Sequence, residues 1–202
     1  QSIATLALIF IIFAGGLETP WRSVRPVVAS GVTLATLGVV ITAFVVALVT
    51  WQLLGYSLLE GLLLGSIISS TDAPAVFLVL RSKKLSLKGS LKPLLEFESG
   101  SNDPTAIFLT LSMITALTTG TFALTTITLH FFVQMALGIA SGLLLGKAFV
   151  SLLNNIRFSY EGFYPVTMLA GTVGIYGATA LLGGNGILAV YLAGIVIGNS
   201  DV

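Results

Sequence analysis

The chain has 202 residues, of which 55% are hydrophobic and only 8% are charged. Soluble domains carry roughly 25% charged residues, so this composition excludes an ordinary soluble protein and indicates a membrane protein with several spans. The net charge of +1 gives no reason to expect a nucleic-acid partner, and the absence of cysteine excludes disulfides and thiolate metal sites.

Hydropathy and chain-breaking residues predict about seven membrane-spanning helices, so the expected fold class is an all-α polytopic membrane protein in a lipid bilayer. A span needs about 20 apolar residues, and the predicted segments are 2–17, 27–53, 58–80, 94–118, 124–153, 162–182 and 186–199. The chain starts directly in an apolar run, without the features of a signal peptide, and it stops at the edge of its last span. We therefore expect a fragment of a larger transmembrane domain.

All nine lysines and arginines fall on alternate connections between the predicted spans. They lie in or next to the first, third and fifth connections: Arg22, Arg25, Arg81, Lys83, Lys84, Lys88, Lys92, Lys147 and Arg157. Cytoplasmic loops of membrane proteins carry such an excess of positive charge. The pattern predicts that the residue 1 side lies outside and the residue 202 side lies in the cytoplasm.

An acidic residue lies deep in the third predicted span, beside a proline. Asp72 is nine residues from Arg81, about 13 Å along a helix. Pro74 has no N–H, so the carbonyl of Ser70 loses its helical partner, and residues 71–74 are predicted to break the helix. Unwound backbone at membrane depth lines cavities and coordinates cations in transporters. The alternative is a kink that Asp72 merely caps.

A second acid, Asp103, lies equally deep in the next predicted span. Ser99 lies on the same stripe of that helix, and Asn102 lies on the neighbouring stripe. Pro104 is predicted to be helix-breaking too, which would free the carbonyl of Gly100. Hard oxygen ligands of this kind suit an alkali cation that must leave again, whereas a transition metal is disfavoured without nearby histidine or cysteine. The alternative is a purely structural hydrogen-bond network.

Two glutamates precede Asp103 on the same span. Glu98 could be a ligand, but we expect it to form an ion pair with a cation outside this chain, because no lysine or arginine of the chain lies at its depth. Glu96 lies two or three residues inside the span. It is either an interfacial acid or the mouth of a proton path.

The run from Leu95 to Pro104, with Thr71 and Asp72 on a broken helix, resembles the NhaP-like monovalent cation:proton antiporters. Within that family it is most similar to the CvrA-type potassium:proton antiporters of bacterial inner membranes, and segments 13–17, 186–192 and 198–199 add support. The resemblance implies an NhaA-like inverted-repeat fold, a homodimer and an inner-membrane location. It implies no cofactor beyond the transported K⁺ or Na⁺ and H⁺.

The resemblance also implies residue roles. Asp103 would be the carboxylate that holds a proton and a cation in turn. The further ligands and orienting groups would be Asp72, Ser99, the Thr71 carbonyl and Asn102. Glu98 would pair with an arginine on a later helix. One residue departs from the family pattern, because Ala14 stands where an acid usually follows the phenylalanine, so a third acidic ligand is not expected here.

These features predict secondary active antiport of K⁺ or Na⁺ against H⁺, by competition for one buried carboxylate site. The Asn102–Asp103 pair implies, by resemblance, that the exchange is electroneutral. Two alternatives are a cation channel and an intramembrane aspartyl protease, which would use two aspartates for acid–base catalysis. The Tyr-Asp and Gly-x-Gly-Asp motifs of such proteases do not occur at Asp72 and Asp103.

Overall fold

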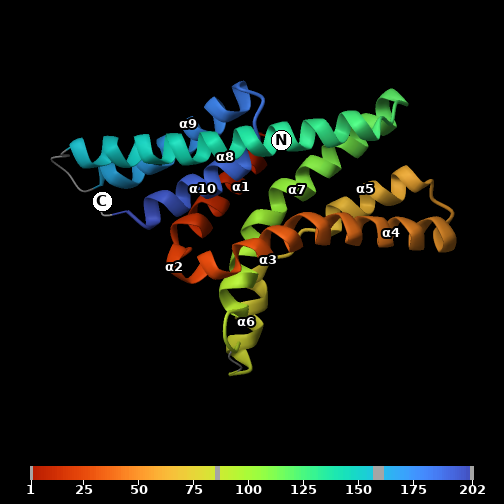
Figure 1. Cartoon of the computed structure of the whole chain (residues 1–202), viewed down its shortest axis with the longest axis horizontal. Helices are drawn as coiled ribbons and strands as arrows, with labels where there is room; N and C mark the ends of the chain where they lie inside the picture. Colours follow the sequence, from red (N-terminus) through yellow and green to blue (C-terminus); the bar gives the residue numbers. More distant parts are fainter. Residues whose placement is uncertain (1, 85–86, 157–161, 201–202) are drawn as a thin grey trace. The chain divides into compact units, whose positions relative to one another are not determined.

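The computed structural model describes residues 2–84, 87–156 and 162–200, and Arg157 of the charge pattern lies outside them. Within these ranges the chain is helical, with short connections and no strand, which confirms the all-helical fold class (Figure 1). The helices are α1 (Ser2–Leu17), α2 (Trp21–Val24), α3 (Val28–Thr33), α4 (Val39–Leu54), α5 (Leu58–Ile68), α6 (Ala73–Ser82), α7 (Leu91–Thr119), α8 (Leu124–Asn155), α9 (Phe163–Leu181) and α10 (Gly186–Gly198). A 3-10 segment, η1 (Arg25–Val27), and a π-helical segment, η2 (Leu34–Gly38), join α2, α3 and α4 into one continuous helical stretch.

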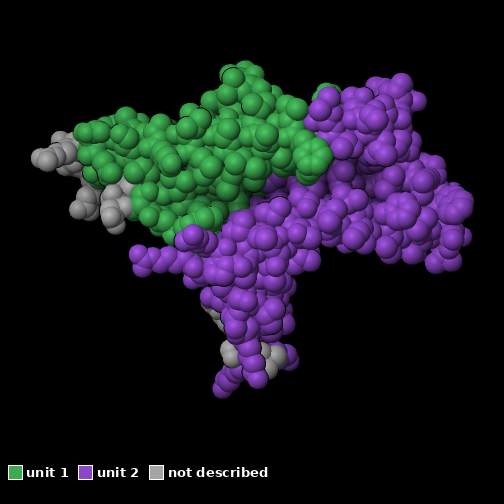
Figure 2. All heavy atoms as spheres, viewed as in Figure 1, with its two compact units in different colours: residues 1–21, 130–202 green, residues 22–129 purple. Residues whose placement is uncertain are grey.

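The chain forms two compact units (Figure 2). Unit 1 comprises Gln1–Trp21 and His130–Val202, and unit 2 comprises Arg22–Leu129. Unit 1 therefore contains α1, α9, α10 and most of α8. Unit 2 contains the helices from α3 to α7.

In unit 1, α10 packs against both α1 and α9. Its core is formed by apolar side chains from these helices and from α8, including Ile9, Phe13, Phe149, Leu153, Ile175 and Val190. Glycines allow the backbones to approach closely, as small residues do between helices in lipid. A Cβ on Gly16 of α1 would lie 2.4 Å from the carbonyl oxygen of Tyr191, and a Cβ on Gly142 of α8 would lie 2.7 Å from that of Ala189.

In unit 2, α4 packs along α5, and both α3 and α5 pack on α7. The turn between α4 and α5 is set by Gly55, which ends α4 with a φ of 71°, and by Ser57, which begins α5. The Ser57 hydroxyl accepts from the N–H of Glu60 at 3.3 Å, and the Glu60 carboxylate accepts from the N–H of Ser57 at 2.8 Å. This reciprocal capping satisfies two backbone donors at the helix start.

The predicted third span contains a break, at a slightly different position from the expected one. The helix α5 ends at Ile68 and α6 begins at Ala73, so residues 69–72 are non-helical instead of residues 71–74. Pro74 is the second residue of α6. A proline in the first helical turn lacks only an N–H that has no intrahelical partner, so it favours the start of the new helix.

The prediction that Pro104 breaks its helix is wrong. The helix α7 runs from Leu91 to Thr119 through Pro104 without interruption. A proline removes one backbone hydrogen bond, here to the carbonyl of Gly100, but the other turns of this 29-residue helix keep theirs. Because α7 also packs against α3 and α5, the missing bond is insufficient to open it.

Candidate functional site

The non-helical residues between α5 and α6 are hydrogen-bonded to the middle of α7. The Ser99 hydroxyl on α7 donates to the carbonyl oxygen of Thr71 at 2.8 Å. The Thr71 hydroxyl in turn donates to Oε2 of Glu98 at 2.9 Å. The sequence prediction that a broken helix and the acidic segment of the next helix face each other thus corresponds to direct contacts within unit 2.

Asn102 lies at the centre of these contacts and its side chain is completely buried. Its Nδ2 donates to Oγ1 of Thr71 at 2.6 Å and to Oε1 of Glu98 at 2.9 Å. Thr71, Glu98 and Asn102 therefore form a closed ring of hydrogen bonds. Of the three, Asn102 is buried, Glu98 is partly buried and Thr71 is exposed, and a polar network holds its members in one arrangement when all of them have partners.

Glu98 serves this ring as an acceptor. One carboxylate oxygen accepts from Thr71, and the other accepts from Asn102. Within the described ranges its contacts are thus with neutral donors of the same unit. The expected ion pair with an arginine stays a prediction, because the chain covers only part of the length of its relatives.

Asp103 is half-buried and its carboxylate also faces the break. Oδ1 of Asp103 accepts a hydrogen bond from the Ser70 hydroxyl. The same hydroxyl lies 3.5 Å from Oδ1 of Asn102. Sequence reasoning treated Ser70 only as a source of a free backbone carbonyl and missed its side chain. The available signal was its place beside Thr71 in a helix that Pro74 interrupts.

Asp72 has a different environment from Asp103. Its side chain is exposed, and Oδ1 accepts weakly from the N–H of Ala75 at 3.5 Å in the first turn of α6. The Asp72 carbonyl accepts from the N–H of Val76 at 3.3 Å. An acid at this position caps the helix and is favoured by the helix dipole. Asp72 thus caps α6, as in the alternative to a cation ligand, and a ligand role for Asp72 stays a prediction.

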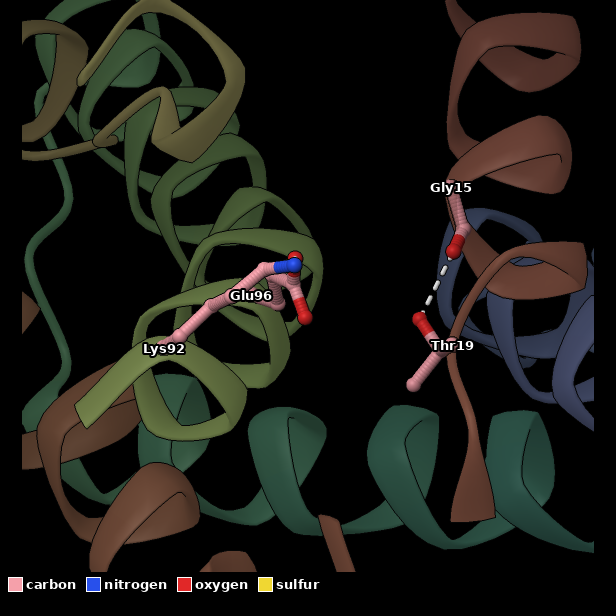
Figure 3. Close-up of polar contacts among 4 residues, drawn as sticks. All are labelled: Gly15, Thr19, Lys92 and Glu96. Carbon is pink, nitrogen blue, oxygen red and sulfur yellow. Dashed lines mark hydrogen bonds and ion pairs between the residues drawn. The ribbon is translucent and has the colours of Figure 1, made fainter. Parts of the chain in front are cut away.

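Glu96 lies apart from the ring, nearer the start of α7. Its Oε1 is 3.6 Å from Nζ of Lys92, and the two side chains point toward each other from successive turns (Figure 3). Both are partly exposed, and an exposed pair of this spacing contributes at most a few tenths of a kcal/mol, roughly 0.3–0.5. The hydroxyl of Thr19 donates to the carbonyl oxygen of Gly15 at 2.7 Å, and Figure 3 shows these two groups facing each other. Ala14, the residue before Gly15 in the sequence, is exposed.

The chemistry available at the break is that of oxygen ligands. Carboxylate, hydroxyl, amide and carbonyl oxygens meet there, from Asp103, Ser70, Asn102 and Thr71. In the part of the chain that the structure describes, no three histidine, cysteine or acidic side chains gather as metal ligands would. Such a set of oxygens suits a weakly held monovalent cation.

The described helices Trp21–Leu54 and Leu124–Asn155 are long and apolar enough to cross a membrane. A helix interrupted beside a partly buried acid on its neighbour is typical of membrane transporters. The transmembrane model of the sodium/hydrogen exchanger family matches residues 1–202, and the chain belongs to this family of integral membrane transporters. Because the family does not consist of enzymes, the aspartyl protease alternative is excluded.

Individual relatives agree with the family. The chain is 39% identical over 198 residues to the K(+)/H(+) antiporter NhaP of Alkalimonas amylolytica. This alignment covers 98% of the chain and 34% of that protein. It is 29% identical over 191 residues to the Na(+)/H(+) antiporter ApNhaP of Aphanothece halophytica, covering 94% of the chain and 36% of that protein. The chain thus spans about a third of the length of these curated relatives, and the predicted NhaP-like resemblance is confirmed.

A solved structure has the same fold. The sodium proton antiporter MjNhaP1 of Methanocaldococcus jannaschii, determined at pH 8, superposes with a TM-score of 0.77. The match covers 95% of this chain and 47% of that chain, at 24% sequence identity. The likeness establishes the helical fold.

Proposed function

We propose that the protein to which this chain belongs exchanges a monovalent cation, K⁺ or Na⁺, for H⁺ across the membrane. The observation that carries the proposal is the break at residues 69–72, which is hydrogen-bonded to α7 beside the carboxylate of Asp103. A carboxylate near a bilayer midplane costs at least about 2.5 kcal/mol to insert. A chain keeps such a group where an ion or a proton neutralises it.

In the proposed mechanism, Asp103 binds either a proton or the cation, and movement between the two sides of the membrane is allowed only when it is neutralised. This competition couples the two fluxes without a chemical reaction. Ser99, the Thr71 carbonyl and Asp72 are proposed as further cation ligands. Asn102 is proposed to orient Thr71 and Glu98, and its hydrogen bonds to both support this role.

Three further features belong to the same proposal. The exchange is electroneutral, since a neutral asparagine rather than a second acid precedes Asp103. Glu96 lies on a proton path. The intact protein is a homodimer in a bacterial inner membrane and needs no cofactor.

The decisive experiment measures exchange in proteoliposomes made with the full-length protein. The substitution Asp103→Asn keeps the shape of the side chain but removes its charge and its titration, so we expect pH-driven K⁺ or Na⁺ flux to fall to the level of empty liposomes. Glu18→Gln is the matched control, because Glu18 is an exposed acid just after α1 and lies in unit 1. This control should keep the native rate.

The same assay separates the alternatives. An Asp103→Asn protein that still exchanges cations for protons would rule out the proposed site. A cation channel would pass K⁺ or Na⁺ down its gradient without moving protons, and the internal pH would then stay constant. Electroneutral exchange should be unaffected when the membrane potential is clamped at zero.

A further inference from the structure

The side chain of Ser70 is in an unusual position for a residue of a broken helix. Its hydroxyl donates a hydrogen bond to Oδ1 of Asp103 on α7, instead of to a backbone carbonyl of its own segment. Its oxygen also lies 3.5 Å from Oδ1 of Asn102. Ser70 therefore links the break to the carboxylate that the proposed function uses.

The neighbouring residue, Ser69, provides the contrast. Its hydroxyl is buried and donates to the carbonyl oxygen of Ser66 at 2.8 Å, within the last turn of α5. Ser66 and other hydroxyl residues of the chain bond in the same local way, since Ser66 donates to Leu62 and Thr50 donates to Val46. A hydroxyl that bonds its own helix is ordinary for serine and threonine, whereas the Ser70 bond joins the non-helical residues 69–72 to α7.

We propose that Ser70 is a positioning residue for Asp103 and thereby sets the affinity of the site for its cation. The inference rests on the proposed function of Asp103. A hydroxyl has one donor and two acceptor lone pairs, and an ionised carboxylate has about four acceptor positions. The hydrogen bond from Ser70 holds Oδ1 toward the break and leaves room on the carboxylate for a monovalent cation. Hydrogen bonds to charged groups are the strong ones, so the orientation of the carboxylate depends on this donor.

The position of Ser70 also explains why this role belongs to the break. A serine or threonine inside a regular helix commonly bonds a carbonyl of the preceding turn, although Ser99 on α7 instead donates to the Thr71 carbonyl. Because residues 69–72 are non-helical, the Ser70 hydroxyl is available to another helix. Any movement of the break relative to α7 changes this hydrogen bond together with the Ser99 bond to the Thr71 carbonyl.

The test compares Ser70→Ala, Ser70→Thr and Ser69→Ala in the full-length protein. Transport is measured in proteoliposomes over a range of KCl or NaCl, whichever the native protein exchanges faster, with choline chloride keeping the ionic strength constant. Loss of a hydrogen bond to a charged group should raise the KM of Ser70→Ala about tenfold. The maximal rate at saturating cation should stay close to the native rate. Ser70→Thr keeps the hydroxyl and should restore the native KM.

Ser69→Ala removes a buried hydroxyl from the same break without touching Asp103, so it should leave the KM unchanged. A second readout needs no transport: cation binding raises the thermal unfolding midpoint of the purified protein, and Ser70→Ala should need about tenfold more KCl or NaCl for the same rise. Ser70→Cys, with its weaker S–H donor, should have an intermediate KM and covers the case in which the alanine variant does not fold.

Three results would overturn the inference: equal KM changes for Ser70→Ala and Ser69→Ala, no recovery with Ser70→Thr, or a loss of maximal rate at an unchanged KM. Asp103→Asn, measured in parallel, shows whether the positioning role of Ser70 fails alone or the proposed function fails as well. If Asp103→Asn is inactive while Ser70→Ala keeps the native KM, the function stands and only the positioning role fails. If Asp103→Asn exchanges cations for protons, the proposed function of Asp103 fails, and the positioning role of Ser70 that rests on it fails too.

Discussion

At the residue scale, the site is organised by neutral side chains that hold two acids. Asn102 is completely buried and donates to both Thr71 and Glu98. Ser70 donates to Asp103, and Ser99 donates to the backbone of the break. Each acid thus has a defined partner in unit 2. Both carboxylates are partly buried, and small hydroxyl and amide donors satisfy them there.

Replacement of Asn102 should weaken this arrangement. Asn102→Ala leaves the partly buried Glu98 carboxylate and the exposed Thr71 hydroxyl each without one hydrogen bond, and a typical hydrogen bond contributes about 0.5–1.5 kcal/mol to stability. We expect a clear drop in the thermal unfolding midpoint of the full-length protein in detergent. Ser112→Ala on the same helix is the control, because Ser112 donates to Phe108 of its own helix. A drop no larger than that of the control would contradict the role given to Asn102.

Most of the residues that form this site are predictable from the sequence. Asp103, Asn102, Ser99 and Thr71 were predicted from their spacing and from the neighbouring prolines, and the structure brings them together. The side chain of Ser70 was missed because spacing does not show which way a residue of a non-helical segment points.

At the element scale, unit 1 depends on close contacts between helix backbones. Gly198 of α10 lies so near α1 that a Cβ there would be 2.1 Å from the carbonyl oxygen of Leu17. The Asn199 side chain then joins the ends of the two helices. Its Nδ2 donates to the carbonyl of Thr19 at 2.9 Å, and its Oδ1 accepts from the N–H of Trp21 at 2.8 Å. The ends of α1 and α10 are thus held together by the close approach at Gly198 and by the hydrogen bonds of the Asn199 amide.

Two adjacent glycines on α1 test this packing. In Gly16→Ala the new methyl group would meet the Tyr191 carbonyl oxygen at 2.4 Å, and backbone atoms on both sides leave little freedom to move. Overpacking of this kind costs about 1–3 kcal/mol, so the thermal unfolding midpoint should fall. In Gly15→Ala the methyl group meets nothing within 4 Å. Because alanine is the better helix former by up to about 1 kcal/mol, this variant should be at least as stable as the native protein. The reverse order of the two midpoints would contradict the packing.

The two prolines show the limit of sequence reasoning at this scale. The same residue type was predicted to break both helices, but Pro74 starts α6 and Pro104 lies within α7. A proline always removes one hydrogen bond. Whether the helix then opens depends on its neighbours, and the contacts of α3 and α5 with α7 are absent from the local sequence.

At the scale of the whole molecule, the distribution of charge is the main source of information on orientation. Most of the described basic residues lie near the ends of helices or in connections, such as Lys83, Lys84 and Lys88 after α6, whereas Lys147 lies inside α8, eight residues before its end. The connection between α7 and α8 contains no lysine or arginine. The positive-inside rule therefore predicts that the connection between α6 and α7 is cytoplasmic and that the connection between α7 and α8 is external.

Single cysteines can test this orientation directly, since the chain has none of its own. Lys88→Cys and Thr121→Cys place exposed thiols in the two connections. In intact cells expressing the full-length protein, with any other cysteines removed, a membrane-impermeant maleimide should label Thr121→Cys. It should label Lys88→Cys only after the membrane is opened. Labelling of Lys88→Cys in intact cells would show that the orientation is inverted.

The sequence by itself determined that this protein is helical and lies in a membrane, and it predicts acids at membrane depth beside a helix break. These properties follow from composition, periodicity and the missing N–H of proline, which act locally or on average. Only the tertiary structure decided where the break begins, which proline interrupts a helix and which hydroxyl reaches Asp103. Those outcomes depend on packing between helices that are distant in the chain, such as α5 and α7, and on side-chain directions that no local pattern encodes.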